Sequence, residues 1–197
     1  TDFRKAKIQF VHELVKWSGL DKLPKGSRIL DVGCGIGGSS RILAKYYGFN
    51  VTGITISPAQ VKRARELTPS ELSCNFQVMD ALDLKFEDGS FDAIWSVEAG
   101  AHMNDKNKFA DEMLRTLRPG GYLALADWNS RDLNAYPPSF IEKLVLKQLL
   151  EQWVHPNFIS IKEFANILRT NKNSAGIVNS ENWNSYTNPS WYDSIIE

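Results

Sequence analysis

The sequence predicts an α/β domain in which helices cover both faces of a mostly parallel β-sheet, a three-layer sandwich. Short β-branched and apolar runs alternate with segments of helical period between residues 26 and 130. Glycines follow the first of these runs at the point where a helix begins. The 197 residues suffice for one well-buried core, so we expect a single domain, with its core at 26–130 and a helical region at 131–197.

The predicted strands are apolar and β-branched, and turn residues bound them. They lie at 29–32, 51–56, 76–79, 91–97, 122–126 and 175–182. Because strands and helices alternate, right-handed crossovers and a parallel sheet follow, and ligands should bind beyond the carboxyl ends of the strands. Those ends are at 31–35, 55–57, 80–81, 97–102 and 127–128.

The predicted helices have apolar residues at helical spacing. They lie at 3–17, 39–47, 59–67, from about 105 to a stop at 118–121, at 140–153, and from 160 to about 170. Ser57 followed by Pro58 gives an N-cap and a first-turn proline. Either Asn104 or Asp105 caps the fourth helix, and Ser160 with Glu163 forms a capping box.

The turn after the first strand, Asp31-Val32-Gly33-Cys34-Gly35-Ile36-Gly37-Gly38, predicts a ligand site. Gly33, Gly35 and Gly38 have the G-x-G-x-x-G spacing, which alone indicates a nicotinamide or flavin cofactor. Asp31 changes this interpretation, because a carboxylate repels a pyrophosphate but accepts hydrogen bonds from an ammonium group.

Composition excludes several function classes. Lys and Arg (23) balance Asp and Glu (23), so no net field recruits nucleic acid. The two cysteines, Cys34 and Cys74, lie apart from the scattered histidines, which predicts reduced thiols and no metal site. No segment approaches the roughly 20 apolar residues of a membrane span, and no signal peptide opens the chain. We expect a cytoplasmic protein.

Several strand ends together resemble one family. The segments 31–41, 53–60 and 98–103 resemble the tocopherol-pathway branch of the class I S-adenosylmethionine-dependent methyltransferases. Segments 126–132, 153–156 and 191–195 resemble in particular its cyanobacterial members, which act on 2-methyl-6-phytyl-1,4-benzoquinol. The resemblance covers nearly the whole chain. It implies a Rossmann-like fold, S-adenosylmethionine as the methyl donor and ring C-methylation of a prenylated benzoquinol in tocopherol biosynthesis.

The resemblance also implies a set of cofactor residues. These are Asp31, Gly33, Gly35, Thr55, Ile56, Gln60, Asp80, Ala81 and Val97. Many class I enzymes carry an acid at the end of strand two, where this chain has Thr55 and Ile56. Thr55 and Gln60 are then expected to hold the ribose, and the missing acid also disfavours a nicotinamide cofactor. Asp80 suits the adenine amine, and the Ala81 N–H group suits the adenine ring.

For the methyl acceptor, His102 is the best-placed general base, because a quinol is a better carbon nucleophile when its hydroxyl is deprotonated. Glu98 either orients His102 or binds the head group. The alternative is that His102 only packs or contacts the methionine moiety. His155 is a second candidate for contact with the substrate, whereas His12 is expected at the surface.

A prenyl tail needs an apolar trough beside the head group. Helix 140–153 could line it together with Trp128, Trp183 and Trp191, although we expect most of that helix to be core and Trp128 to touch substrate. Rival functions are methylation of tocopherol, sterol, fatty-acid or amine acceptors, and a non-catalytic cofactor-binding module. Peripheral membrane contact is expected because the substrate dissolves in a bilayer, and the oligomeric state is left open.

The strand count predicts an incomplete sheet. Class I methyltransferases usually have a seventh strand, antiparallel beside strand five, but only six strands can be placed here. Residues 194–197 are apolar as if an element began there, and the resembling family also starts earlier with an apolar segment. We therefore expect a fragment whose sheet has an unpaired, apolar edge.

Overall fold

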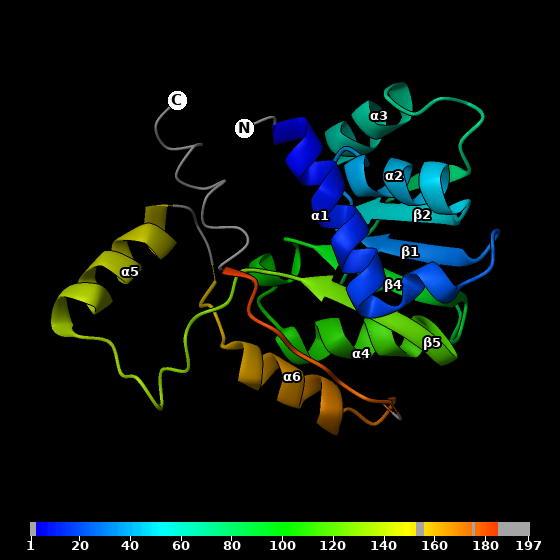
Figure 1. Ribbon diagram of the computed structural model, residues 1–197. Helices are drawn as coiled ribbons and strands as arrows, with labels where there is room; N and C mark the ends of the chain where they lie inside the picture. The colour runs from blue at the N-terminus through cyan, green and yellow to red at the C-terminus, as the bar shows by residue number, and fades with distance from the viewer. Residues whose placement is uncertain (1–2, 153–155, 175, 185–197) are drawn as a thin grey trace.

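The computed structural model describes residues 3–152, 156–174 and 176–184. Five parallel strands form one sheet in the order β3-β2-β1-β4-β5 (Figure 1). The strands are β1 (Arg28–Val32), β2 (Asn50–Thr55), β3 (Cys74–Val78), β4 (Phe91–Val97) and β5 (Leu117–Ala126). The chain begins at the centre of the sheet and builds outward in both directions, so the order reverses between β1 and β4. Ligands of open parallel sheets bind at such a reversal.

Helices cover both faces of the sheet, as predicted (Figure 1). One face carries α1 (Phe3–Ser18), α2 (Gly38–Tyr47) and α3 (Pro58–Glu66), and the other carries α4 (Lys106–Thr116) and α6 (Ile161–Thr170). Two short 3₁₀ turns, η1 (Leu20–Lys22) and η2 (Gly100–His102), follow α1 and β4. Helix α5 (Phe140–Gln152) stands apart from the sheet (Figure 1).

The core has two halves because successive strand residues point to opposite faces. In β4, Trp95 packs with Val15 and Leu43 on the α1–α2 side. Its neighbour Ile94 packs with Phe109 on the α4 side. Both β4 residues are fully buried, which explains why this strand reads as a continuous apolar run in the sequence.

The local capping signals are confirmed. The Ser57 hydroxyl accepts from the Gln60 amide at the start of α3, with Pro58 in the first turn. Asp105, not Asn104, caps α4. At the start of α6 the capping box forms in both directions between Ser160 and Glu163.

The boundary between α4 and β5 differs from the prediction. Residues 118–121 were expected to separate helix from strand, but the helix ends at Thr116 and Leu117 already pairs with Phe91 of β4. The next β4 pairing joins Ala93 to Tyr122, so 118–121 form an irregularity inside β5. The glycine-rich turn signal is real, but a strand can absorb such a turn when its flanks stay in register with a neighbour.

The prediction that most of α5 is core was wrong. None of its side chains is buried, and Phe140 and Ile141 are 82% and 72% exposed. Apolar residues occupy nearly the whole circumference of this helix, so the sequence does not indicate which face, if any, has a partner.

The predicted sixth strand at 175–182 is also wrong for the residues that the structure describes there, 176–182, which form no strand. The segment has short polar residues such as Asn179 and Ser180, which favour loops over strands. It is tied to α6 by the Arg169 guanidinium, which donates to the Val178 carbonyl at 2.9 Å.

His12 was expected at the surface, but it is half-buried between α1 and α2. Its Nδ1 lies 2.7 Å from the Tyr47 hydroxyl, and its ring meets Tyr46 edge-on. The pairing joins residues 35 positions apart, which no local pattern reveals.

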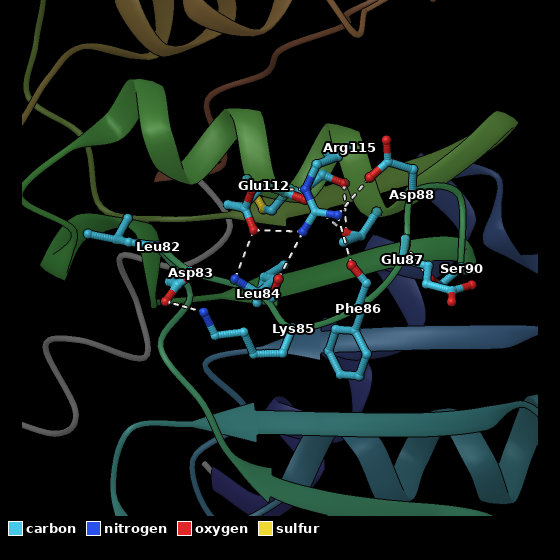
Figure 2. Close-up of polar contacts among 12 residues, drawn as sticks. Leu82, Asp83, Leu84, Lys85, Phe86, Glu87, Asp88, Ser90, Glu112 and Arg115 are labelled. Atoms are coloured by element: carbon cyan, nitrogen blue, oxygen red, sulfur yellow. Dashed lines mark hydrogen bonds and ion pairs between the residues drawn. The ribbon is translucent and has the colours of Figure 1, made fainter.

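Arg115 of α4 fixes the long connection between β3 and β4 (Figure 2). Its guanidinium donates to the carbonyls of Leu84 and Phe86 at 2.9 and 2.8 Å and to the Asp88 carboxylate at 2.8 Å. Glu112, one turn earlier, pairs with Arg115 and accepts from the Leu84 amide at 2.8 Å. The connection that begins with Asp80 is thereby tied to α4.

The outer edge of β5 pairs with no other strand among the residues that the structure describes. The Glu98 amide donates to the Ala126 carbonyl, so Ala126 turns its backbone toward β4, and by alternation Leu123 and Leu125 turn theirs away from β4. A groove of about 1230 Å³ runs along this edge between α1 and α6. Its apolar lining includes Leu14 and Trp17 of α1, Leu123 and Leu125 of β5, and Phe164 and Leu168 of α6.

We expect this edge to accept a further strand, because outward-facing amides inside an apolar groove need hydrogen-bond partners. In the chain of residues 1–197, the amides of Leu123 and Leu125 should exchange with deuterium faster than that of Ala124. In a chain extended beyond residue 197, the two fast amides should become protected. Equal protection of all three amides in residues 1–197 would contradict an open edge.

Candidate functional site

The turn between β1 and α2 is built on left-handed glycines. Gly33, Gly35 and Gly37 have φ values of 76°, 53° and 76°, a region that disfavours every residue with a Cβ. A side chain at Gly33 would collide with Ala99, whereas the space beside a Cβ at Gly35 is open. The turn therefore packs on the segment after β4 at Gly33 and leaves room for a ligand at Gly35.

Asp31 lies beneath this turn at the end of β1. It is 2% exposed, and the Ser40 hydroxyl of α2 donates to its carboxylate at 2.5 Å. Burial raises the pKa of Asp31 to about 6, and the hydrogen bonds from Ser40 oppose the rise. A cation above the turn would interact with this carboxylate through surroundings of low dielectric, where charge–charge attraction is strong.

Thr55 and Gln60 come together as expected at the end of β2. The Thr55 hydroxyl donates to the Gln60 side-chain oxygen at 2.7 Å and accepts from the Ser57 amide at 3.3 Å. Thr55 is buried and Gln60 is exposed, so the threonine orients an amide that faces solvent. The neighbouring Ile56 side chain is 72% exposed and offers an apolar surface to a ring at the same sheet edge.

Asp80 and Ala81 begin the connection after β3. Asp80 is exposed and accepts from the Leu82 amide at 2.8 Å, while Ala81 is buried. They stand at the carboxyl edge beside the end of β2, because Thr55 pairs with Val78. The Arg115 contacts described above hold the rest of this connection in place (Figure 2).

Glu98 directly follows Val97, the last residue of β4, and has a strained backbone. Its φ is 55°, and no other non-glycine residue in the described ranges has a positive φ. Its carboxylate accepts from the indole Nε1 of Trp128 at 3.4 Å. The ends of β4 and β5 are thereby joined above the sheet.

His102 is exposed at the end of the η2 turn, on the same sheet edge. Its amide donates to the Ala99 carbonyl at 3.1 Å, and Ala99 is the residue that meets Gly33. The structure thus brings both predicted acceptor-side residues, Glu98 and His102, next to the glycine turn.

Four further residues, Trp128, His155, Trp183 and Trp191, were predicted near the substrate. His155 and Trp191 lie outside the described residues. Trp183 packs against Phe10 and Trp17 of α1, with ring centroids 5.8 and 6.0 Å apart, so the structure links it to the groove along β5. Trp128 lines the carboxyl end of that groove beside Glu98.

Sequence reasoning missed three polar residues near the site: Ser40, Lys106 and Asp127. Ser40 stands nine positions after Asp31, and only the strand–turn–helix geometry reveals that they pair. Asp127 directly follows β5, and burial raises its pKa to about 6. Its place at a strand end was visible in the sequence, but its closeness to Lys106 was not.

No group of histidine, cysteine and acidic side chains within the described ranges could hold a metal ion. Cys34 and Cys74 are both free, and burial raises the pKa of both thiols. Within the same ranges, no helix is long and apolar enough to cross a bilayer.

Comparison with known proteins agrees with this geometry. Residues 30–125 match the methyltransferase domain family. The chain is 58% identical to 2-methyl-6-phytyl-1,4-hydroquinone methyltransferase of Synechocystis sp. over 98% of its own length and 61% of that protein. It is 36% identical to the chloroplastic tocopherol O-methyltransferase of Arabidopsis thaliana over 95% of the chain and 56% of that relative. The chain therefore spans little more than half the length of these curated relatives.

Among solved structures, a proposed sarcosine dimethylglycine methyltransferase from Galdieria sulphuraria superposes with a TM-score of 0.75 at 25% identity, over 85% of this chain and 62% of that one. The sheet order, the glycine turn at the strand reversal and these matches identify the chain as a class I methyltransferase. Within that class, it is similar to the 2-methyl-6-phytyl-1,4-hydroquinone and tocopherol methyltransferases named above.

The Asp31 geometry predicts pH-dependent binding of S-adenosylhomocysteine. If the ligand's ammonium needs an ionised Asp31, the Kd should rise up to tenfold per pH unit below about pH 6 and level off above pH 7, because the proton must leave first. Asp31→Asn should weaken binding at pH 8 by about 10- to 100-fold and abolish the pH dependence.

Isothermal calorimetry between pH 5 and 8 measures both effects, with Asp21→Asn, an exposed acid on η1, as the control. Unchanged affinity in Asp31→Asn would overturn this role. Tight binding of NAD would overturn the assignment of the turn to S-adenosylmethionine.

Proposed function

We propose that the chain is the catalytic part of an S-adenosylmethionine-dependent enzyme that C-methylates the aromatic ring of a prenylated benzoquinol of the 2-methyl-6-phytyl-1,4-benzoquinol type, in tocopherol biosynthesis. The observation that carries the proposal is the 58% identity over nearly the whole chain to a methyltransferase named for that hydroquinone. The arrangement of the strand ends supports it independently.

The residues at the carboxyl edge fit the cofactor part by part. Asp31 supplies a negative charge under the methionine ammonium, and Gly35 leaves the backbone open beside the chain of the ligand. The Thr55–Gln60 pair presents an oriented amide to the ribose hydroxyls, and Asp80 is exposed for the adenine amine. When bound, S-adenosylmethionine supplies an electrophilic methyl group on a sulfonium.

The protein's part in the reaction is alignment, exclusion of water and proton removal. Methyl transfer forms one carbon–carbon bond, breaks one carbon–sulfur bond and releases the ring proton. We propose His102 as the base that takes the quinol hydroxyl proton, which raises the electron density of the ring carbon that attacks the methyl group. Glu98, held by the Trp128 indole, either orients His102 or binds the second hydroxyl.

The same residues also suit related acceptors. The 36% identity to a tocopherol O-methyltransferase makes oxygen or ring methylation of tocopherol-like phenols the second candidate. Sterols, fatty acids and amines are further acceptors that this class of enzyme could use, and a cofactor-binding module without catalysis is the non-enzymatic alternative.

We propose that residues 1–197 belong to a single domain that works in the cytoplasm in peripheral contact with a membrane. The proposed substrate carries a prenyl tail and dissolves in lipid, so the enzyme must meet it at a bilayer surface. The exposed apolar side chains of α5, including Phe140 and Ile141, support a peripheral contact.

An acceptor series tests the proposal. With the full-length protein and tritiated S-adenosylmethionine, transfer to a short-chain 2-methyl-6-prenyl-benzoquinol should exceed transfer to tocopherols, sterols, fatty acids or amines by at least about tenfold in kcat/KM. Preferred transfer to any other acceptor would reassign the substrate. Cofactor binding with no turnover of any acceptor would leave only the binding module.

His102→Ala should lower kcat for the quinol by about 10²-fold or more, since a general base typically contributes that much, while the Kd for S-adenosylhomocysteine stays nearly unchanged. Asn104→Ala, an exposed neighbour beyond the turn, is the matched control. If His102→Ala retains full activity, the base lies elsewhere, and Glu98→Gln and His155→Ala identify which group replaces it.

A further inference from the structure

The turn that carries His102 is held by the side chain of one lysine. Lys106 directs its Nζ at three backbone carbonyls, those of Gly100, Ala101 and Met103, at 2.6, 2.9 and 2.7 Å. An ammonium has three N–H donors, and here each has a carbonyl partner. The Gly100 carbonyl also accepts from the Met103 amide, whereas the carbonyls of Ala101 and Met103 obtain their partner from this side chain.

The position of Lys106 is electrostatically unfavourable for its own helix. It is the first residue of α4, where the helix dipole places partial positive charge and favours acids. Partial burial also lowers its pKa from the usual value of a lysine. A cation at this position does not stabilise α4. The contacts of Lys106 with the preceding turn therefore explain why a lysine stands there.

Asp127, at the end of β5, supplies the opposite charge. Its carboxylate accepts from the backbone amide of Trp128 at 2.9 Å, and the Ala101 amide and the nearby charge of Lys106 both favour its ionised form by lowering its pKa. Any side chain at Gly100 would collide with this carboxylate, so glycine allows the acid to lie directly against the turn. The η2 turn is therefore held by Lys106 from α4 and by Asp127 from β5.

The turn held in this way joins the two halves of the site. Ala99, which directly precedes the turn, meets Gly33 of the glycine turn, and the last residue of η2 is His102. Glu98, with its strained backbone, stands immediately before it. A shift of this turn would change the distance between the acceptor-side residues and the cofactor turn.

We infer that Lys106, with Asp127 as its counter-charge, is a positioning residue for methyl transfer: it sets the place of His102 relative to the glycine turn. The effect of Lys106 on catalysis, but not its hold on the turn, rests on the proposed function. We assign both residues a role through the turn, not through contact with the acceptor or the cofactor.

The test compares Lys106→Met, Lys106→Arg and the control Lys108→Met, an exposed lysine one half-turn further along α4, in the full-length protein. Lys106→Met should lower kcat per S-adenosylhomocysteine-binding site by about 10- to 100-fold, the effect of misplacing a reacting group by about 1 Å, with Kd changed less than about threefold. Lys106→Arg should recover part of the loss, because a guanidinium keeps the charge and several donors. Lys108→Met should behave as the unmodified protein.

A double-mutant cycle with His102→Ala shows whether Lys106 acts through the histidine. Lys106→Met should cost little further activity when His102 is already absent, since both changes remove the same contribution. Fully additive losses, an unchanged kcat in Lys106→Met, or a loss matched by an equal loss of binding sites and of thermal stability would overturn the inference.

Hydrogen exchange separates this inference from the proposed function. The amides of His102 and Met103, which donate to the carbonyls of Ala99 and Gly100, should exchange at least about tenfold faster in Lys106→Met than in Lys108→Met. Faster exchange in a protein that methylates no quinol would support the hold on the turn while overturning the proposed substrate. Unchanged exchange would overturn the hold itself.

Discussion

The close approach of Gly33 to Ala99 is the constraint on which the site depends. It is possible only because β1 and β4 are neighbours in register at the strand reversal and because Gly33 has no side chain. The positive φ of Gly33 turns the chain out of β1, and the contact with Ala99 limits how far the segment after β4 can move. The glycine turn and the acceptor-side segment, which are 66 positions apart when measured from Gly33 to Ala99, are thereby held at one edge.

Asp31 places a negative charge at the carboxyl edge of the sheet, but its burial destabilises the ligand-free protein. The folded pKa of about 6 lies above the ordinary value of 3.8, so the folded state keeps its proton longer than the unfolded chain as the pH rises. Stability is therefore lost between about pH 4 and 6, on the order of 3 kcal/mol at neutral pH, and the loss would be larger without the hydrogen bond from Ser40. A bound cation would recover that free energy, which makes the carboxylate more useful to a ligand than to the fold.

The features that the sequence predicts well depend on residues that are neighbours in the sequence. The strand at 91–97 and the caps at Ser57 and at Ser160 with Glu163 depend on signals within a few positions, and each is confirmed. What it predicts poorly depends on distant partners. The turn at 118–121 is part of β5 because Leu117 pairs with Phe91. The exposure of the apolar helix α5 could not be predicted, because no sequence pattern indicates what lies opposite a helix. Lys106 gave no signal at all, since its role comes from carbonyls that only the fold brings within reach.

The segment from β1 to β5 and the parts of the molecule around it differ in how closely they are paired and packed. From β1 to the end of β5, which is nearly the span of the matched methyltransferase domain at 30–125, the inner strands β2, β1 and β4 pair on both sides, and the proposed cofactor residues lie at their carboxyl ends and at that of β3. By contrast, the outer edge of β5 borders an open groove, and α5 has no buried side chain. Methyl donors are the same throughout this class, whereas the two relatives are named for different acceptors, 2-methyl-6-phytyl-1,4-hydroquinone and tocopherol. A rigid shared half beside a less constrained half is the arrangement that lets acceptor specificity change without disturbing the glycine turn, provided that the η2 turn between them stays in place.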